Sequence, residues 1–467
     1  MCSLSKIIDI PYGAKMKNCI IVGGGISGLF AAIMAKDNCD KVTVIESADS
    51  CGGLLCSWKN TDGITFDFGT HILSETAHDP INQILFKGMY ERPELWHSLA
   101  VTKVSNVFNG QRYDKGQFIA LPFLDELDYH KALDEVKEAP GMALDDAAHL
   151  QQFAQANYGQ TITEKIFRPV MKKLQDSELE QLHPISHVFF ALNRFVPGDA
   201  EFSRELKKSL TLDARLAFAS YNEGLSSAVK FYPKARGIQL WVEQLINQAQ
   251  EKGVEIKISS RITELSHNDG AISAVILQNG ESLPCEHLVW TIPPIFAIKQ
   301  LGLTYQGVSP KFCPMSLHHL VFDRPFVDKN YYSQINDFNS QSFRVTFYPN
   351  ITLDESKAPY NCTVEVLCSD IKDKEILNKM VEQELKNLGY VDQDAILLSY
   401  DIVDIPMGFP QFTNDFVAEK KRQITLIEDN INNISLIGKA SKQEFFVYGI
   451  VQETYNQLSK LFGLKAL

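Results

Sequence analysis

Three glycines and one acid near the N-terminus have the spacing of a site that binds a dinucleotide. The glycines are Gly23, Gly25 and Gly28, and the acid is Glu46. The apolar run at residues 19–22 predicts a buried strand, residues 29–35 favour a helix, and residues 41–45 predict a second strand that ends at the acid. The stretch therefore predicts a βαβ unit with a Gly-x-Gly-x-x-Gly turn.

Each glycine has a separate role in such a turn. Gly23 permits the tight turn out of the strand, Gly25 lets a pyrophosphate approach the backbone because it has no Cβ, and Gly28 lets the helix pack closely on the strand. The free N–H groups at the start of the helix, around Ile26 and Ser27, lie at the positive end of its dipole and favour phosphate.

The acid narrows the choice of nucleotide. Glu46 can accept hydrogen bonds from a ribose diol and would repel a 2′-phosphate, so an adenosine without that phosphate is favoured. The glycine turn and the acid do not choose between NAD and FAD. The alternative to a nucleotide site is a glycine-rich loop in an ordinary α/β core.

The length, composition and net charge limit the kinds of protein that this chain can be. The chain has 467 residues, of which 45% are hydrophobic and 22% charged, as in a globular protein with two or three domains. The net charge of −12 argues against a general nucleic-acid binder. A local basic pocket for an anionic substrate remains compatible with that charge.

The cysteines and the apolar segments indicate the cellular compartment of the protein. Nine cysteines include no Cys-x-x-Cys pair, so we expect reduced thiols in a cytoplasmic protein. No segment is long and apolar enough to predict a transmembrane helix. Residues 1–16 precede the first strand and predict a cap or a disordered tail. The sequence does not indicate an oligomeric state.

Two segments after the βαβ unit resemble one group of flavoproteins. Residues 51–54 read Cys-Gly-Gly-Leu, and residues 66–71 read Phe-Asp-Phe-Gly-Thr-His. They resemble the superfamily of amine oxidases, protoporphyrinogen oxidases and UDP-galactopyranose mutases. The resemblance implies FAD as cofactor and places four residues near its phosphates or its ring: Gly53, Leu54, Thr70 and His71. Many relatives carry an arginine shortly before the glycine pair, and residues 47–51 contain none.

The resemblance recurs later in the chain. Ile262 stands where relatives contact the adenine through the backbone. Residues 434–452 resemble the last flavin-binding segment, in which a strand ends at a glycine, here Gly438. The next helix would begin near Val447 and Tyr448 and point its N-terminus at the flavin. Lys439 replaces the arginine that follows the glycine in relatives.

Several other polar residues have two interpretations each. Four cations at helical spacing could form a basic rim for an anionic substrate or a solvated helix face; they are Lys165, Arg168, Lys172 and Lys173. His183 and His187 are four apart, but no third ligand motif accompanies them, so we predict no metal. Arg344 would face the substrate by resemblance, as a catalytic residue together with His71, or it would make a cross-strand ion pair.

These segments predict an α/β fold with a discontinuous, Rossmann-type FAD-binding domain. Residues 15–80, 225–300 and 430–467 would build that domain, and a mixed α+β substrate domain would comprise residues 81–224 and 301–429. In the substrate domain, residues 98–108 predict one strand, Asn109-Gly110 a hairpin turn, and residues 111–121 the returning strand.

Three functions fit this sequence. The first is an FAD-dependent oxidoreductase in which a small organic substrate gives a hydride to the flavin. The second is a redox-neutral enzyme of the UDP-galactopyranose mutase type, in which reduced flavin attacks the sugar of a sugar nucleotide. The third is a flavin-binding protein without catalytic activity. We rank them in this order. No second Gly-x-Gly-x-x-Gly turn follows a strand, which disfavours a fourth class, enzymes that reduce the flavin with NAD(P)H on a separate domain.

Overall fold

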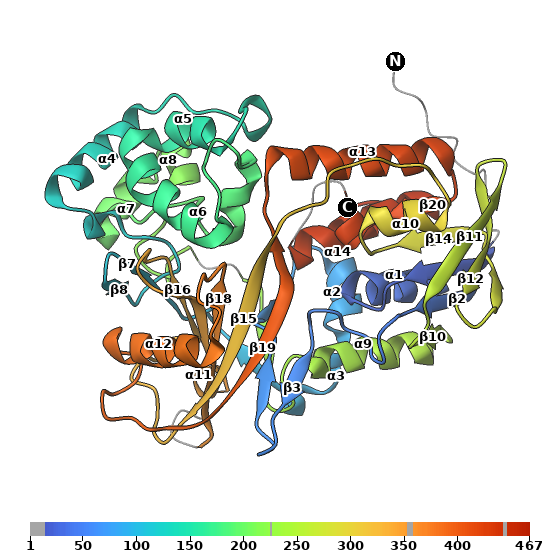
Figure 1. Cartoon of the computed structure of the whole chain (residues 1–467), viewed down its shortest axis with the longest axis horizontal. Helices are drawn as coiled ribbons and strands as arrows, with labels where there is room; N and C mark the ends of the chain where they lie inside the picture. The colour runs from blue at the N-terminus through green and yellow to red at the C-terminus, as the bar shows by residue number, and fades with distance from the viewer. Residues whose placement is uncertain (1–14, 225–226, 353–357, 442–445) are drawn as a thin grey trace.

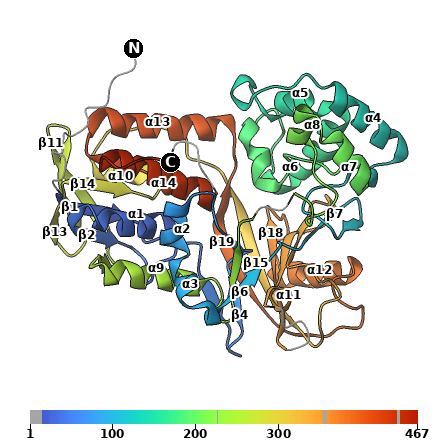
Figure 2. The ribbon, with the colours of Figure 1, turned by 180° about the vertical axis from the view of Figure 1, so that it is seen from behind.

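The computed structural model describes residues 15–224, 227–352, 358–441 and 446–467. The chain forms two bodies that lie side by side in both views (Figures 1 and 2). One is a layered α/β body, and the other is a mixed sheet with a group of helices at one end. The predicted α/β fold, with a Rossmann-type parallel sheet and a mixed α+β part, is confirmed.

The α/β body is built on a five-stranded parallel sheet in the order β10-β2-β1-β14-β20. Its strands are β1 (Met16–Val22), β2 (Cys39–Ile45), β10 (Glu255–Lys257), β14 (His287–Trp290) and β20 (Ile434–Leu436). The sheet therefore joins segments from the start, the middle and the end of the chain. The predicted domain limits follow this pattern and stay a prediction.

Both faces of the parallel sheet are covered, which explains its continuous apolar runs. In β1, Cys19 and Ile21 pack with helices α1 (Ile26–Lys36), α9 (Gln239–Glu251) and α14 (Val447–Leu461). Ile20 and Val22 pack on the opposite face. That face is covered by α10 (Pro294–Gln300), α13 (Asn414–Asn430) and a three-stranded meander of β11 (Ile262–Asn268), β12 (Ala271–Leu277) and β13 (Ser282–Pro284).

The second body is built on a seven-stranded sheet in the order β19-β15-β18-β17-β16-β7-β8. Its strands are β7 (Val104–Phe108), β8 (Gln111–Tyr113), β15 (Phe312–Phe322), β16 (Tyr332–Ile335), β17 (Ser342–Phe347), β18 (Tyr360–Leu367) and β19 (Leu397–Pro410). Helix α12 (Lys374–Asn387) packs on one face through an apolar cluster. The opposite face meets the helical lobe, which Figure 1 shows in green at one corner of the molecule.

The helical lobe and the connections contain short elements. The lobe comprises α4 (Glu126–Glu138), α5 (Leu150–Ile162), the π-helix η4 (Thr163–Phe167), α6 (Arg168–Gln175), η5 (Pro184–Phe190), α7 (Ala200–Leu206) and α8 (Leu210–Arg215). Two small sheets connect the bodies, one of β3 (Ser57–Lys59) and β4 (Thr65–Asp67), the other of β5 (Leu73–Ser74), β9 (Lys230–Pro233) and β6 (Trp96–Leu99). The remaining helices are α2 (Asp79–Leu85), α3 (Lys87–Glu91), η1 (Pro93–Leu95), η2 (Leu121–Phe123), η3 (Leu144–Asp146), α11 (Tyr348–Ile351) and η6 (Gly438–Ala440).

One predicted strand is wrong. Residues 98–108 belong to two strands, β6 and β7, which lie in different sheets. The apolar alternation runs through both strands because each packs against a core, so periodicity could not show where the chain changes sheets. The hairpin turn at Asn109-Gly110 is confirmed by positive φ angles of 50° and 68°. The returning strand ends at Tyr113, well before the predicted residue 121.

No helix among the described residues is long and apolar enough to span a membrane.

The two histidines of the lobe make local contacts. His183 precedes η5, and its Nδ1 accepts from the Ile185 N–H at 3.3 Å. His187 is buried, and its Nδ1–H donates to the Pro184 carbonyl at 2.6 Å. Burial lowers the pKa of His187 to about 4. No group of three or more metal-ligating side chains occurs in the described part of the chain.

The buried His187 makes stability depend on pH. Between about pH 6.5 and 4 the unfolded chain binds a proton at this residue that the folded protein does not, so the free energy of unfolding falls as pH falls. The slope from one such group is at most about 1.4 kcal/mol per pH unit. We expect His187→Gln to reduce the measured slope by up to that amount in urea unfolding, with exposed His130→Gln as the control. An unchanged slope would contradict the buried, neutral state.

Candidate functional site

The glycine turn connects β1 to α1 as the sequence predicts. Gly23 has φ +99°, and a Cβ on Gly28 would lie 1.9 Å from the Gly23 carbonyl oxygen. Only glycine therefore fits at position 28. A Cβ on Gly25 would meet no atom within 4 Å, so the backbone there is open to an approaching group. Helix α1 begins at Ile26 with no side-chain cap and no acid in its first turn.

The glycine pair of residues 52–53 lies beside the turn. The Gly52 N–H donates to the Gly24 carbonyl at 2.9 Å. A Cβ on Gly53 would meet only the Gly25 Cα, at 3.8 Å. Leu54 exposes 53% of its surface although it is a large apolar residue. Backbone without Cβ atoms therefore lines both sides of this place, which suits a bulky anionic group.

Glu46 is fixed at the carboxyl end of β2. Its Oε2 accepts from the Gly24 N–H at 2.7 Å, and its Oε1 accepts from the Ala48 N–H at 2.8 Å. These bonds hold the carboxylate beside the glycine turn, where remaining lone pairs can accept from hydroxyl groups. The Ser260 N–H donates to the Glu46 carbonyl at 2.8 Å, so Ile262, at the start of β11, lies on the same side of the turn.

A second strand-to-helix connection lies next to the first. Gly438 follows β20 with φ +62°, and a Cβ there would lie 2.9 Å from Ser27 Oγ. Helix α14 begins at Val447, as predicted, and packs against α1 (Figure 2). It also has no side-chain cap and no acid in its first turn. Residues 442–445, which connect the two, lie outside the described residues. Two uncapped helix N-termini thus face the same edge of the parallel sheet.

The segment after β4 runs from the second body to α14. Thr70 Oγ1 hydrogen-bonds to Thr346 Oγ1 on β17. The half-buried His71 donates from Nε2 to the Phe68 carbonyl at 3.2 Å, and burial lowers the pKa of its imidazole. Three residues later, the Ser74 N–H donates to the Tyr448 hydroxyl at 2.5 Å. The segment therefore places Thr70 and His71 between the large sheet and the start of α14.

Arg344 makes the cross-strand ion pair. Its Nε and Nη2 donate to the two carboxylate oxygens of Glu365 at 2.7 and 2.8 Å, in a bidentate geometry. Glu365 is 2% exposed and the Arg344 side chain 25% exposed. The ion pair also lies beside the segment that carries Thr70 and His71. A Cβ placed on Gly69 would be 3.4 Å from the Glu365 carboxylate. Of the two interpretations, the ion pair is confirmed, and a contact of Arg344 with substrate stays a prediction.

Three further residues at this place were not predicted: Thr346, Tyr348 and Glu365. The Tyr348 hydroxyl accepts from the Asp67 N–H at 2.9 Å and lies 2.7 Å from Thr363 Oγ1. Only Glu365 leaves a signal in the sequence, as the one acid in the apolar strand β18. The others are ordinary strand residues until the sheet register brings them to the turn.

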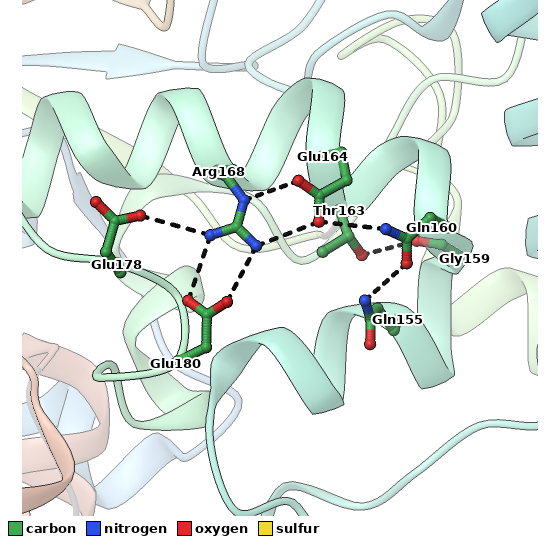
Figure 3. Close-up of polar contacts among 8 residues, drawn as sticks. All are labelled: Gln155, Gly159, Gln160, Thr163, Glu164, Arg168, Glu178 and Glu180. Carbon is green, nitrogen blue, oxygen red and sulfur yellow. Dashed lines mark hydrogen bonds and ion pairs between the residues drawn. The ribbon is translucent and has the colours of Figure 1, made fainter.

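Of the two interpretations of the four cations on the helical lobe, the contacts disfavour the basic rim. Figure 3 shows the Arg168 guanidinium between Glu164 on one side and Glu178 and Glu180 on the other, with Nε 2.8 Å from Glu164. Lys165 pairs with Asp128, and Lys172 pairs with Asp176. Lys173 is turned inward and donates to three backbone carbonyls, at 2.8–2.9 Å. Acids or backbone carbonyls therefore contact all four cations, so none of them is held ready for an anionic substrate.

The contribution of the Arg344–Glu365 ion pair to the free energy of unfolding can be tested by substitution. Arg344→Met leaves a buried carboxylate without a partner, so we expect a loss of about 3–5 kcal/mol in the free energy of unfolding. The double variant Arg344→Met/Glu365→Met should recover most of that loss, because no buried charge remains.

Chemical unfolding at pH 8 measures both variants. Arg92→Met is the control, since Arg92 and Glu94 form an exposed pair whose loss should cost less than about 1 kcal/mol. A double variant that is no more stable than Arg344→Met would contradict the buried-pair interpretation.

The chain is similar to curated proteins over most of its length. It is 23% identical over 435 residues to the 15-cis-phytoene desaturase of Solanum lycopersicum, which spans 85% of this chain and 69% of that protein. It is 28% identical over 500 residues to the 4,4′-diapolycopene oxygenase of Methylomonas sp, which spans 96% of this chain and 90% of that protein.

Solved structures share the fold. The crystal structure of reduced UDP-galactopyranose mutase matches with a TM-score of 0.71 at 13% identity and covers 97% of each chain. At 13% identity the match shows that the two proteins share a fold, and it does not show a shared reaction. The predicted resemblance is confirmed by a family model, that of the flavin-containing amine oxidoreductases, which matches residues 26–382. The chain therefore belongs to the flavin-containing amine oxidoreductase family.

Proposed function

We propose that the protein binds FAD where the N-termini of α1 and α14 meet, and that it oxidises a small organic substrate by hydride transfer to the flavin. The observation that carries this proposal is the convergence of the two uncapped helix starts with the Thr70–His71 segment. FAD, when bound, supplies the ring that accepts the hydride.

The residues of the glycine turn fit the adenosine and pyrophosphate parts of FAD. The open backbone at Gly25 and the amides of Ile26 and Ser27 would hold the pyrophosphate. Glu46 would accept from the ribose hydroxyls, and the backbone at Ile262 would meet the adenine. Gly53 and Leu54 would cover the phosphates or the adjoining ring from the other side.

The residues at the other end fit the flavin ring. Val447 and Tyr448 present the positive end of α14, which would favour negative charge at the pyrimidine end of the ring. Gly438 brings the backbone close to Ser27, where a Cβ would lie 2.9 Å from the Ser27 hydroxyl. Thr70 and His71 would lie against the ring, and the sheet behind them, with Arg344, would hold the substrate.

The comparisons support oxidation over the alternatives. The family is flavin-containing, and the curated relatives are named as a desaturase and an oxygenase, which are redox enzymes. The redox-neutral mutase reaction is supported only by a similarity of fold to a solved UDP-galactopyranose mutase. Anaerobic mixing separates the two: an oxidoreductase bleaches its flavin with substrate and recovers colour with an acceptor, whereas a mutase needs prior reduction and consumes no acceptor.

A pair of glycine variants tests the cofactor site. Gly25→Ala adds a methyl group that meets no protein atom, so we expect an unchanged melting temperature and FAD affinity lowered by about tenfold or more. Gly28→Ala should instead lower the melting temperature, because its Cβ collides with backbone.

Titration of the FAD-free protein, followed by flavin fluorescence, measures the affinity. Gly116→Ala is the control, since a Cβ there makes only an ordinary contact with Tyr113. A parent protein that takes up no FAD, or a Gly25→Ala variant that binds FAD as tightly as the parent, would contradict the proposed site.

A further inference from the structure

Four polar residues stand in one row across the large sheet. Glu365 on β18 is opposite Arg344 on β17, Arg344 is opposite Gln334 on β16, and Gln334 is opposite Asn106 on β7. We call these four residues the polar row. Since neighbouring strands lie about 4.8 Å apart, the row extends over about 14 Å.

The polar row lies on the face of the sheet that is turned away from α12. In β16, Ser333 and Ile335 point toward the α12 side, where Ser333 meets Tyr390, so Gln334 points to the opposite side. In β7, Val107 packs on the α12 side, so Asn106 also points away from it. A β-bulge between Ser342 and Arg344 gives Phe343 and Arg344 the same orientation.

One end of the row touches the segment that carries Thr70 and His71. The Glu365 carboxylate lies against Gly69, and Thr346, two residues after Arg344, contacts Thr70. The row therefore begins beside the place proposed for the flavin ring and leads away from it along the sheet.

One buried polar atom of the row, on Asn106, has no partner in the described residues. Asn106 is fully buried; its Nδ2 donates to the Gln117 carbonyl at 2.8 Å, but its Oδ1 accepts no bond. Gln334 is 5% exposed, and its carboxamide makes no hydrogen bond within the described chain. Arg344, whose side chain is 25% exposed, uses Nε and Nη2 for Glu365, so its Nη1 is a further donor that solvent or a ligand can reach.

A buried amide without a partner costs about 1–3 kcal/mol. Proteins rarely keep such groups unless water or a ligand satisfies them. Asn336, the next residue on this face after Gln334, is fully buried and also leaves both its amide oxygen and its amide nitrogen without a partner. The unpartnered buried amide atoms of Asn106 and Asn336, beside the unused carboxamide of Gln334, are therefore a better match to a bound polar group than to packing alone.

We propose that the polar row binds an uncharged, hydrogen-bonding end of the substrate, such as an amide or a hydroxyl group, while the bond to be oxidised lies toward His71. This inference rests on the proposed function and adds the substrate class to it. Arg344 is neutralised by Glu365, so a carboxylate gains little here, and a pure hydrocarbon would leave the amides unpaired. Gln334 offers both a donor and an acceptor, which a primary amide or a hydroxyl can match.

A set of three matched probes tests the inference. Benzamide, benzoate and toluene share one ring and differ in the group that would meet the row. FAD-loaded protein is titrated with each while the flavin difference spectrum is recorded, and we expect benzamide to bind more tightly than the other two. Binding of toluene or benzoate as tight as that of benzamide would overturn the inference.

The variant Gln334→Met assigns the binding to the row. Met has a similar length without the amide, so we expect benzamide affinity to fall by about tenfold and the melting temperature to stay at or above that of the parent. Exposed Gln383→Met, on α12, is the matched control and should bind benzamide as the parent does. Equal benzamide affinity in the parent and Gln334→Met would overturn the inference and leave water as the partner of the amides. Gln334→Asn, which withdraws the amide by one methylene, replaces Gln334→Met if that variant does not fold.

The same probes on the FAD-free protein separate the two proposals. Saturation-transfer NMR detects benzamide binding without a flavin signal. A protein that binds no FAD but loses benzamide on Gln334→Met would refute the proposed function and keep the polar site. A protein that binds and reduces FAD but shows no effect of Gln334→Met would keep the function and refute the polar site.

Discussion

The arrangement of the candidate site depends on the buried carboxylate of Asp67. It accepts from the Ser57 hydroxyl at 2.7 Å, the Tyr232 hydroxyl at 2.7 Å and the Ile238 N–H at 2.9 Å. These donors come from β3, from β9 and from the residue before α9, so one carboxylate joins the β3–β4 hairpin to a stretch about 170 residues later in the sequence. Burial raises the pKa of the Asp67 carboxyl, and the three donors offset only part of that rise. Because a buried carboxylate is tolerated only with such partners, the position of the chain after Asp67 is closely defined.

That position connects the two bodies. The Asp67 N–H donates to the Tyr348 hydroxyl, which follows β17 of the large sheet, and the chain then continues through Thr70 and His71 toward α14. The two helix starts supply positive potential at one edge of the parallel sheet, and the large sheet supplies polar side chains opposite. Cofactor and substrate would thus be held by different bodies, and a short segment fixed by Asp67 would set the distance between them.

The sequence predicted what depends on local patterns and missed what depends on register. Gly23, Gly28 and Glu46 lie in one short βαβ unit, and their spacing along the sequence is enough to predict the turn. The two interpretations of Arg168 could not be separated, because two of its three acids, Glu178 and Glu180, lie in a later loop. Gln334 and Asn106 are more than 200 residues apart and become neighbours only through the parallel pairing of β16 with β7. Periodicity gives the face of a residue on its strand, but it does not give the partner strand or its register.

The flavin spectrum of a His71→Ala variant tests the central claim most directly, because His71 lies on the segment that Asp67 positions between the two bodies. The absorbance maximum and the reduction potential of bound FAD should be compared with those of the parent, together with the melting temperature. If the segment meets the flavin ring, the spectrum or the potential shifts while the melting temperature stays near the parent value. If the melting temperature falls and both flavin properties stay unchanged, His71 is a structural residue, and the proposed place of the ring is wrong.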